Sequence, residues 1–160
     1  MKAASIREIK HELGNMSQGE LMELCLKMTK FKKENKELVT YLLFEASDEA
    51  SYIQSIKEDM DELFGELNLG SPYYAKKGVR KIQRVIKKCI RYSKNKETEV
   101  ELLIYFCEHL NRVNHLLGKS MVLRNINLRQ IEAIRKTINH LHEDLQYDYK
   151  IDLDAIAAKV

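Results

Sequence analysis

The sequence predicts an all-α fold, and three observations support this prediction. The chain of 160 residues contains one proline and six glycines, so few residues interrupt helices. Over long stretches, apolar residues recur at intervals of three and four, which is the period of an amphipathic helix. The Asn-Gly and Asp-Gly turns that mark β-hairpins do not occur, and no long run alternates apolar and polar residues.

Repeated capping signals predict the first two helices. Ser5 with Glu8, and Ser17 with Glu20, each form a capping box, in which a side chain and the helix backbone satisfy each other's hydrogen bonds. Gly14 is expected to stop the first helix in a left-handed conformation. The second helix is expected to bury Leu21, Leu24, Cys25, Met28 and Phe31.

A third helix is predicted to start near Glu34 and to bend or break at Ser47-Asp48. Before that point it is expected to bury Leu38, Tyr41, Leu42 and Phe44. The apolar pattern then resumes and ends between Gly65 and Gly70. Its core residues are predicted to be Tyr52, Ile53, Ile56, Met60, Leu63 and Phe64.

The fourth helix is the most distinctive element of the sequence. Ser71-Pro72 predicts its start, because serine caps helices and proline fits the first helical position. The helix is expected to extend to about Ser93. At about 100° per residue, its apolar residues fall on one face and its basic residues on the other. Residues 76–96 hold no acid and ten basic residues: Lys76, Lys77, Arg80, Lys81, Arg84, Lys87, Lys88, Arg91, Lys94 and Lys96.

The fifth helix is expected at the centre of the core. Asn95 can cap it, and the acids that follow favour the positive end of a helix. Residues 102–107 are apolar nearly all round, so we expect them to be buried. Gly118 is expected to end this helix.

A sixth helix is predicted to begin near Ser120 or Asn127. It is expected to bury Leu128, Ile131, Ile134, Ile138, Leu141 and Leu145. Residues 148–160 are expected to form a frayed tail or a short final helix. Because short loops join neighbouring helices, we expect about six helices in antiparallel hairpins. They would form a compact bundle or a HEAT-like α-α superhelix, as a single domain over residues 1–160.

Composition indicates where such a protein resides. Cys25, Cys89 and Cys107 are odd in number and widely spaced, which favours buried free thiols in a reducing cytosol. The N-terminus lacks the apolar core of a signal peptide. No run of about 18 apolar residues exists to span a membrane. The sequence therefore predicts a cytoplasmic protein without a membrane partner.

Signatures of catalysis and metal binding are missing from the sequence. A di-iron bundle needs two Glu-x-x-His pairs, and this chain does not supply two. Glu108 and His109 are adjacent, so they point to different faces of a helix. A glycine-rich phosphate loop and a Gly-x-Ser-x-Gly motif do not occur. We therefore predict no catalytic residue, no metal site and no cofactor, and an enzyme ranks third among the functions considered.

Charge is segregated along the chain although the net charge is only +3. Residues 45–66 carry eight acids against Lys57 alone, directly before the basic helix. These two segments can neutralise each other within one chain, or pair between two copies as an isologous dimer.

The sequence predicts a non-catalytic interaction module that binds another macromolecule through the basic helix face within residues 76–96. An acidic protein or a second copy is the expected partner, since Arg and Lys bind carboxylates. Nucleic acid is the alternative, with Tyr73, Tyr74 and Tyr92 placed to stack on bases. The predicted binding residues are Lys77, Arg80, Lys81, Arg84, Lys87, Lys88 and Arg91.

The first quarter of the chain resembles a group of uncharacterised all-helical bacterial proteins of the Bacteroidetes type. The resemblance is carried by residues 9–13, 17–24, 30–37 and 41–44, which are mostly capping and core positions. It implies a helical cytoplasmic bacterial protein. It assigns no functional residue.

Overall fold

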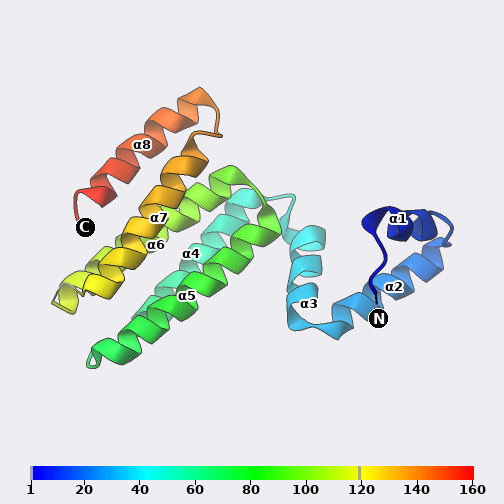
Figure 1. Ribbon diagram of the computed structural model, residues 1–160, viewed down its shortest axis with the longest axis horizontal. Helices are drawn as coiled ribbons and strands as arrows, with labels where there is room; N and C mark the ends of the chain where they lie inside the picture. The colour runs from blue at the N-terminus through cyan, green and yellow to red at the C-terminus, as the bar shows by residue number, and fades with distance from the viewer. Residues whose placement is uncertain (1, 119) are drawn as a thin grey trace. The chain divides into compact units, whose positions relative to one another are not determined.

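The computed structural model of this protein describes residues 2–118 and 120–160, and they contain eight α-helices, one π-helical segment and no strand (Figure 1). The all-α prediction is confirmed, but the expected number of about six helices is wrong. The predicted third helix is divided, and the predicted tail forms a helix of its own. Contacts group the chain into two compact units, residues 1–44 and residues 45–160. A single domain over the whole chain stays a prediction.

The first unit contains α1 (Ile6–Gly14), α2 (Gln18–Phe31) and α3 (Lys33–Thr40). Both predicted capping boxes are present. The Ser5 N–H donates to Glu8 Oε2 at 2.7 Å, and the Ser17 N–H donates to Glu20 Oε2 at 2.8 Å. These hydrogen bonds hold the pKa of each glutamate below its usual value.

The end of α1 differs from the prediction. Among the described glycines only Gly118 has a positive φ, so Gly14 does not adopt the left-handed conformation. Asn15 instead keeps a right-handed conformation, and its N–H donates to the Glu12 carbonyl at 3.0 Å. A tight last turn of this kind satisfies terminal carbonyls without glycine geometry.

Burial in the first unit was also predicted wrongly. Helices α1, α2 and α3 contain no buried residue. Leu21 and Leu24 are half-buried, whereas Cys25, Met28 and Phe31 are exposed. Three short helices enclose little volume, so their apolar faces keep much of their contact with water.

The predicted break near Ser47-Asp48 is confirmed. Residues Tyr41–Glu45 form the π-helical segment η1, in which Tyr41 is buried but Leu42 and Phe44 are exposed. Helix α4 (Glu49–Gly65) then begins behind Asp48, whose Oδ1 accepts the Ser51 N–H at 3.0 Å. The core residues predicted for α4 are buried, except for Leu63, which is half-buried.

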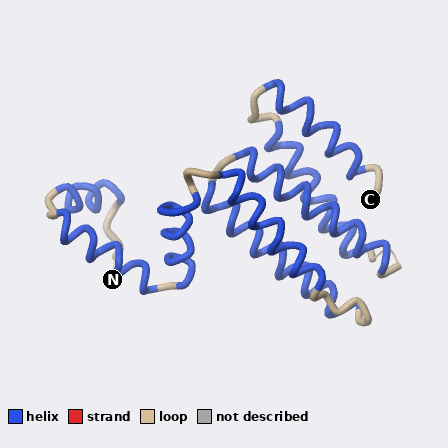
Figure 2. Tube along the Cα trace, turned by 180° about the vertical axis from the view of Figure 1, so that it is seen from behind, coloured by secondary structure: helices blue, strands red, loops and turns tan. Residues whose placement is uncertain are grey.

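The second unit continues with four long helices: α5 (Pro72–Ser93), α6 (Lys96–Leu116), α7 (Met121–Ile138) and α8 (Glu143–Ala157). Helix α6 packs against α4, α5, α7 and α8. Figures 1 and 2 show α4 to α7 running side by side, with α5 and α7 in front of α4 and α6 in Figure 1. The prediction that α6 lies at the core centre is confirmed, since Leu102, Phe106, Cys107 and Leu110 are fully buried.

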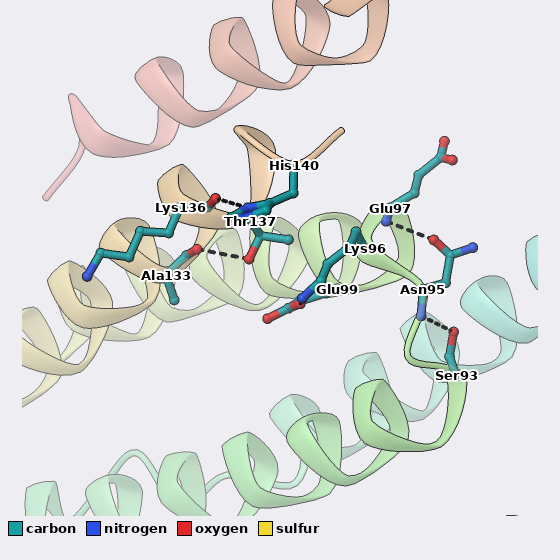
Figure 3. Close-up of polar contacts among 9 residues, drawn as sticks. All are labelled: Ser93, Asn95, Lys96, Glu97, Glu99, Ala133, Lys136, Thr137 and His140. Atoms are coloured by element: carbon teal, nitrogen blue, oxygen red, sulfur yellow. Dashed lines mark hydrogen bonds and ion pairs between the residues drawn. The ribbon is translucent and has the colours of Figure 1, made fainter. Parts of the chain in front are cut away.

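Helix ends in this unit follow the sequence signals. Asn95 Oδ1 accepts the Glu97 N–H at 2.9 Å (Figure 3), and Gly118 adopts φ +70° just after α6. Ser71 and Ser120 occupy the predicted capping positions of α5 and α7, but their side chains make no capping hydrogen bond. These two helices therefore begin where the sequence predicts, but without a hydrogen bond from the serine hydroxyl group.

The C-terminal third contradicts two predictions and decides between the alternatives of a third. Asn127 is buried inside α7 and caps no helix, while Leu128 is exposed. Leu141 and Leu145 are half-buried because α7 ends at Ile138. Of the two alternatives for residues 148–160, the final helix is confirmed and the frayed tail is wrong, since α8 has 15 residues and is anchored by buried Leu153 and Ile156.

Candidate functional site

The predicted binding residues lie on α5, whose sequence determines which face is buried. Ala75, Val79, Ile82 and Ile86 recur at intervals of four, three and four, and all are buried. This apolar face packs on α4 and α6. The opposite face of the same helix therefore points away from both neighbours.

The structure brings the seven predicted residues together on that opposite face. Lys88 is half-buried, and the other six are exposed: Lys77, Arg80, Lys81, Arg84, Lys87 and Arg91. From Lys77 to Arg91 the face is about 21 Å long, at 1.5 Å per helical residue. We call these seven residues the basic face.

Ion pairing leaves much of the basic face unneutralised. Within the described part of the chain, Lys77, Arg80, Lys81 and Lys87 form no ion pair. Arg84 Nε donates only to the backbone carbonyl of Arg80, at 3.3 Å. Lys88 and Arg91 have interaction partners of their own. Exposed cations without carboxylate partners keep their attraction for an external anion.

Two carboxylates of the preceding acidic helix α4 have partners on neighbouring helices: Asp61 contacts α6, and Glu49 accepts hydrogen bonds from Ser93 at the end of α5 and Thr98 of α6. Lys57 Nζ lies 2.8 Å from Glu101 Oε2. Asp61 Oδ1 accepts the Tyr105 hydroxyl at 2.7 Å and lies 3.0 Å from His109 Nε2. The sequence left open whether the acidic segment 45–66 neutralises the basic helix of the same chain. In the structure, this neutralisation does not extend to Lys77, Arg80, Lys81 or Lys87.

Tyrosines flank the basic face unequally. Tyr73 and Tyr74 precede it in the first turn of α5 and are 70% and 57% exposed. Their rings meet edge to face, with centroids 5.4 Å apart. Tyr92 is buried, so its predicted role in stacking on bases is wrong. Only the N-terminal end of the face offers aromatic rings to a ligand.

Helix α7 adds cations that the sequence analysis missed. Arg124, Arg129, Arg135 and Lys136 are all exposed. Together α5 and α7 hold twelve basic residues and one acid, whereas α4, α6 and α8 hold fourteen acids and four basic residues. Alternate helices of the unit therefore carry opposite charge. The sequence indicates these cations, because α7 contains a single acid. The structure adds that the basic helices α5 and α7 alternate with the acidic helices α4, α6 and α8.

A second polar region lies where α4, α6 and α8 meet. The Tyr149 hydroxyl of α8 lies 3.3 Å from both Glu97 Oε1 and Glu101 Oε1. We call Asp61, Glu97, Glu101, Tyr105 and Tyr149, with Lys57 among them, the acidic strip. At one end a cavity of about 360 Å³ opens between α4 and α6, bordered by Glu49, Lys57, Asn95, Glu97, Thr98 and Glu101.

Burial shifts the pKa values of three side chains in or beside the acidic strip. It raises the pKa of Tyr105 to about 12, with the hydrogen bond to Asp61 as the second cause, and raises the pKa of Tyr149 as well. Burial also lowers the pKa of His109, although Asp61 opposes this. His109 is therefore a neutral donor to Asp61 at pH 7.

Residues associated with catalysis are dispersed or inert. Burial raises the pKa of the Cys107 thiol to about 12, so it does not ionise at neutral pH, while Cys89 is half-buried and Cys25 is exposed. The prediction of three buried thiols is wrong for Cys25. In residues 2–118 and 120–160, no three His, Cys, Asp or Glu side chains are grouped to hold a metal ion.

Comparisons with known proteins leave the chain without an assigned relative. No protein-family model, curated protein or solved structure matches it. The resemblance of the first quarter to uncharacterised bacterial proteins stays a prediction. Among the described helices, none is long and apolar enough to cross a lipid bilayer.

Proposed function

We propose that this protein is a non-catalytic helical module that binds another macromolecule through the basic face of α5. The observation that carries the proposal is the exposure of Arg80, Lys81, Arg84 and Lys87 on one rigid helix without carboxylate partners for Lys81 and Lys87. A row of fixed cations about 21 Å long binds a polyanionic surface at several points. An acidic protein supplies such a surface.

Packing favours a HEAT-like α-α superhelix as the scaffold. Each helix from α4 to α8 contacts the next one, and α6 also contacts the helices two positions away on either side, α4 and α8. Stacked hairpins show this pattern of neighbours. In such a scaffold α5 is held between α4 and α6, so the cations on its outer face keep the spacing of one continuous helix.

Fluorescence anisotropy tests the proposal with labelled poly-L-glutamate, single-stranded RNA and duplex DNA at about 50 and 200 mM salt. We expect micromolar binding that weakens steeply with salt. The variant Arg80→Glu/Arg84→Glu/Lys87→Glu should lose at least about tenfold in affinity. The matched control Lys10→Glu/Lys27→Glu/Lys30→Glu makes the same charge change on exposed residues of the first unit and should bind like the natural chain. Equal loss in both variants, or no binding at 50 mM, contradicts the proposal.

Nucleic acid is the second candidate, favoured by the exposure of Tyr73 and Tyr74 at the head of the basic face. Exposed rings beside cations stack on unpaired bases while the cations meet phosphates. Tyr73→Ala/Tyr74→Ala should then weaken binding of single-stranded RNA and leave poly-L-glutamate binding unchanged. Equal effects on both probes exclude base stacking.

A further inference from the structure

The acidic strip is continuous across three helices. Lys57 and Asp61 of α4 contact Glu101, Tyr105 and His109 of α6. Glu97 and Glu101 of α6 contact Tyr149 of α8. The strip is therefore fixed by cross-helix hydrogen bonds, and the basic face is fixed by the packing of α5 on α4 and α6.

Charge within the strip is far from balanced. Among the described lysines, Lys57 is the one that forms an ion pair with an acid of the strip, and it is bound to Glu101 at 2.8 Å. Further exposed acids follow on the same three helices: Glu58, Glu108, Asp148 and Asp152. Carboxylates held this close attract cations from outside the unit.

The chain itself carries the complementary surface. The excess of acids on α4, α6 and α8 is ten, and the excess of basic residues on α5 and α7 is eleven. Because α5 packs on α4 and α6 through its apolar face, its cations point away from the acidic strip of the same copy. Each copy thus carries a basic face and an acidic strip of opposite charge, which lie on different helices and point in different directions.

We propose that the acidic strip of one copy binds the basic face of a second copy. This inference rests on the proposed function, because it names the acidic partner of the basic face. Surfaces of opposite charge steer two molecules together and fix their orientation.

The basic face and the acidic strip of one copy point in different directions, so a contact that joins one basic face to one acidic strip is heterologous. One copy binds the second through its basic face, and the acidic strip of the first copy remains free to bind a third copy. The assembly therefore grows from head to tail, in place of the isologous dimer that the sequence suggests. Attraction between exposed charges is screened by salt, so the assembly should be a low-salt state.

Sedimentation and light scattering of the natural chain test the proposal at about 50 and 500 mM salt. At low salt the average mass should rise with protein concentration, and at high salt it should return to the 18.8 kDa of one chain. A monomer at low salt up to about 1 mM protein overturns the proposal.

Complementary variants identify the surfaces. Arg80→Glu/Arg84→Glu/Lys87→Glu makes the basic face acidic, and Glu58→Lys/Glu108→Lys/Asp152→Lys makes the strip side basic. All six residues are exposed. Each variant alone should stay monomeric at low salt, and an equimolar mixture should associate. The control Lys10→Glu/Lys27→Glu/Lys30→Glu should assemble like the natural chain.

The outcomes separate this proposal from the proposed function. A monomeric natural chain that still binds poly-L-glutamate refutes self-association and leaves the basic face as a binding site for a different acidic protein. Assembly that survives in either triple variant, or a mixture that fails to associate, also overturns the proposal. Assembly lost in each variant and restored in the mixture supports it.

Discussion

Lys57 on α4 and Glu101 on α6 form an ion pair with an N–O distance of 2.8 Å, and their side chains are only 24% and 29% exposed. Lys57 Nζ also lies 5.7 Å from the centre of the Tyr105 ring. This lysine therefore joins two helices and compensates a group of carboxylates that has few other cations nearby.

Lys57→Met should lower the free energy of unfolding by about 1–2 kcal/mol, between the values for exposed and buried pairs. Methionine keeps the apolar stem of the side chain but leaves Glu101 without its partner. Urea denaturation provides the measurement. Lys87→Met, at an exposed position without an ion pair in the described residues, is the control and should change stability by less than about 0.5 kcal/mol. Equal effects of the two substitutions would contradict the role of the pair.

Leu110→Ala and Leu26→Ala make the same chemical change in different environments. Leu110 in α6 is fully buried, so its truncation should cost about 2–5 kcal/mol. Leu26 in α2 is 51% exposed, so its truncation should cost less than about 1 kcal/mol. Thermal or urea unfolding of both variants checks the difference. A large loss at Leu26 would mean that another molecule or segment covers α2 in solution.

His109 should make the second unit less stable in mild acid. Its ring stacks on Phe64 with centroids 4.8 Å apart, and burial lowers its pKa below 6.5. As the pH falls through 6.5, the unfolded chain takes up a proton that the folded chain resists, so stability decreases. The melting temperature should therefore fall between about pH 7.5 and 5.5. His109→Gln should reduce this slope, and His142→Gln, at an exposed position, should not. Parallel slopes in all three proteins would refute the assignment.

Lys94→Gly should stabilise the protein by about 0.5–1 kcal/mol, because Lys94 is the only described non-glycine residue with a positive φ, at 57°. It ends α5, and its N–H donates to the Ile90 carbonyl at 2.9 Å. Glycine adopts this conformation without the strain of a Cβ atom. Urea denaturation checks the gain, with Lys87→Gly inside α5 as a control that should lose stability. A loss at position 94 would contradict the interpretation.

Local signals explain what the sequence predicted well. The caps at Ser5, Ser17 and Asn95 depend on residues within a few positions of each other, so spacing alone reveals them. The basic face is also local, because one helix carries all seven of its residues. The exposure of α2 could not be predicted, because it depends on distant parts of the chain. Periodicity shows which face of a helix is apolar, but not whether another element covers it.

The acidic strip depends on contacts that the sequence does not reveal. Tyr149 reaches Glu97 across 52 positions, and Lys57 reaches Glu101 across 44. The available signal was the spacing of Glu97, Glu101 and Tyr105, which recur every four residues on one face of α6. That pattern marks a polar stripe on α6, but it does not identify the helices on either side.

The central position of α6 also has a consequence for synthesis of the protein. Its eight buried residues are enclosed only when α4, α5, α7 and α8 are all in place. As the chain leaves the ribosome, α6 emerges before α7 and α8, and its apolar surface stays uncovered until residue 157 is free. The second unit should therefore complete its folding late and in one step, and chains truncated before α8 should aggregate or bind chaperones.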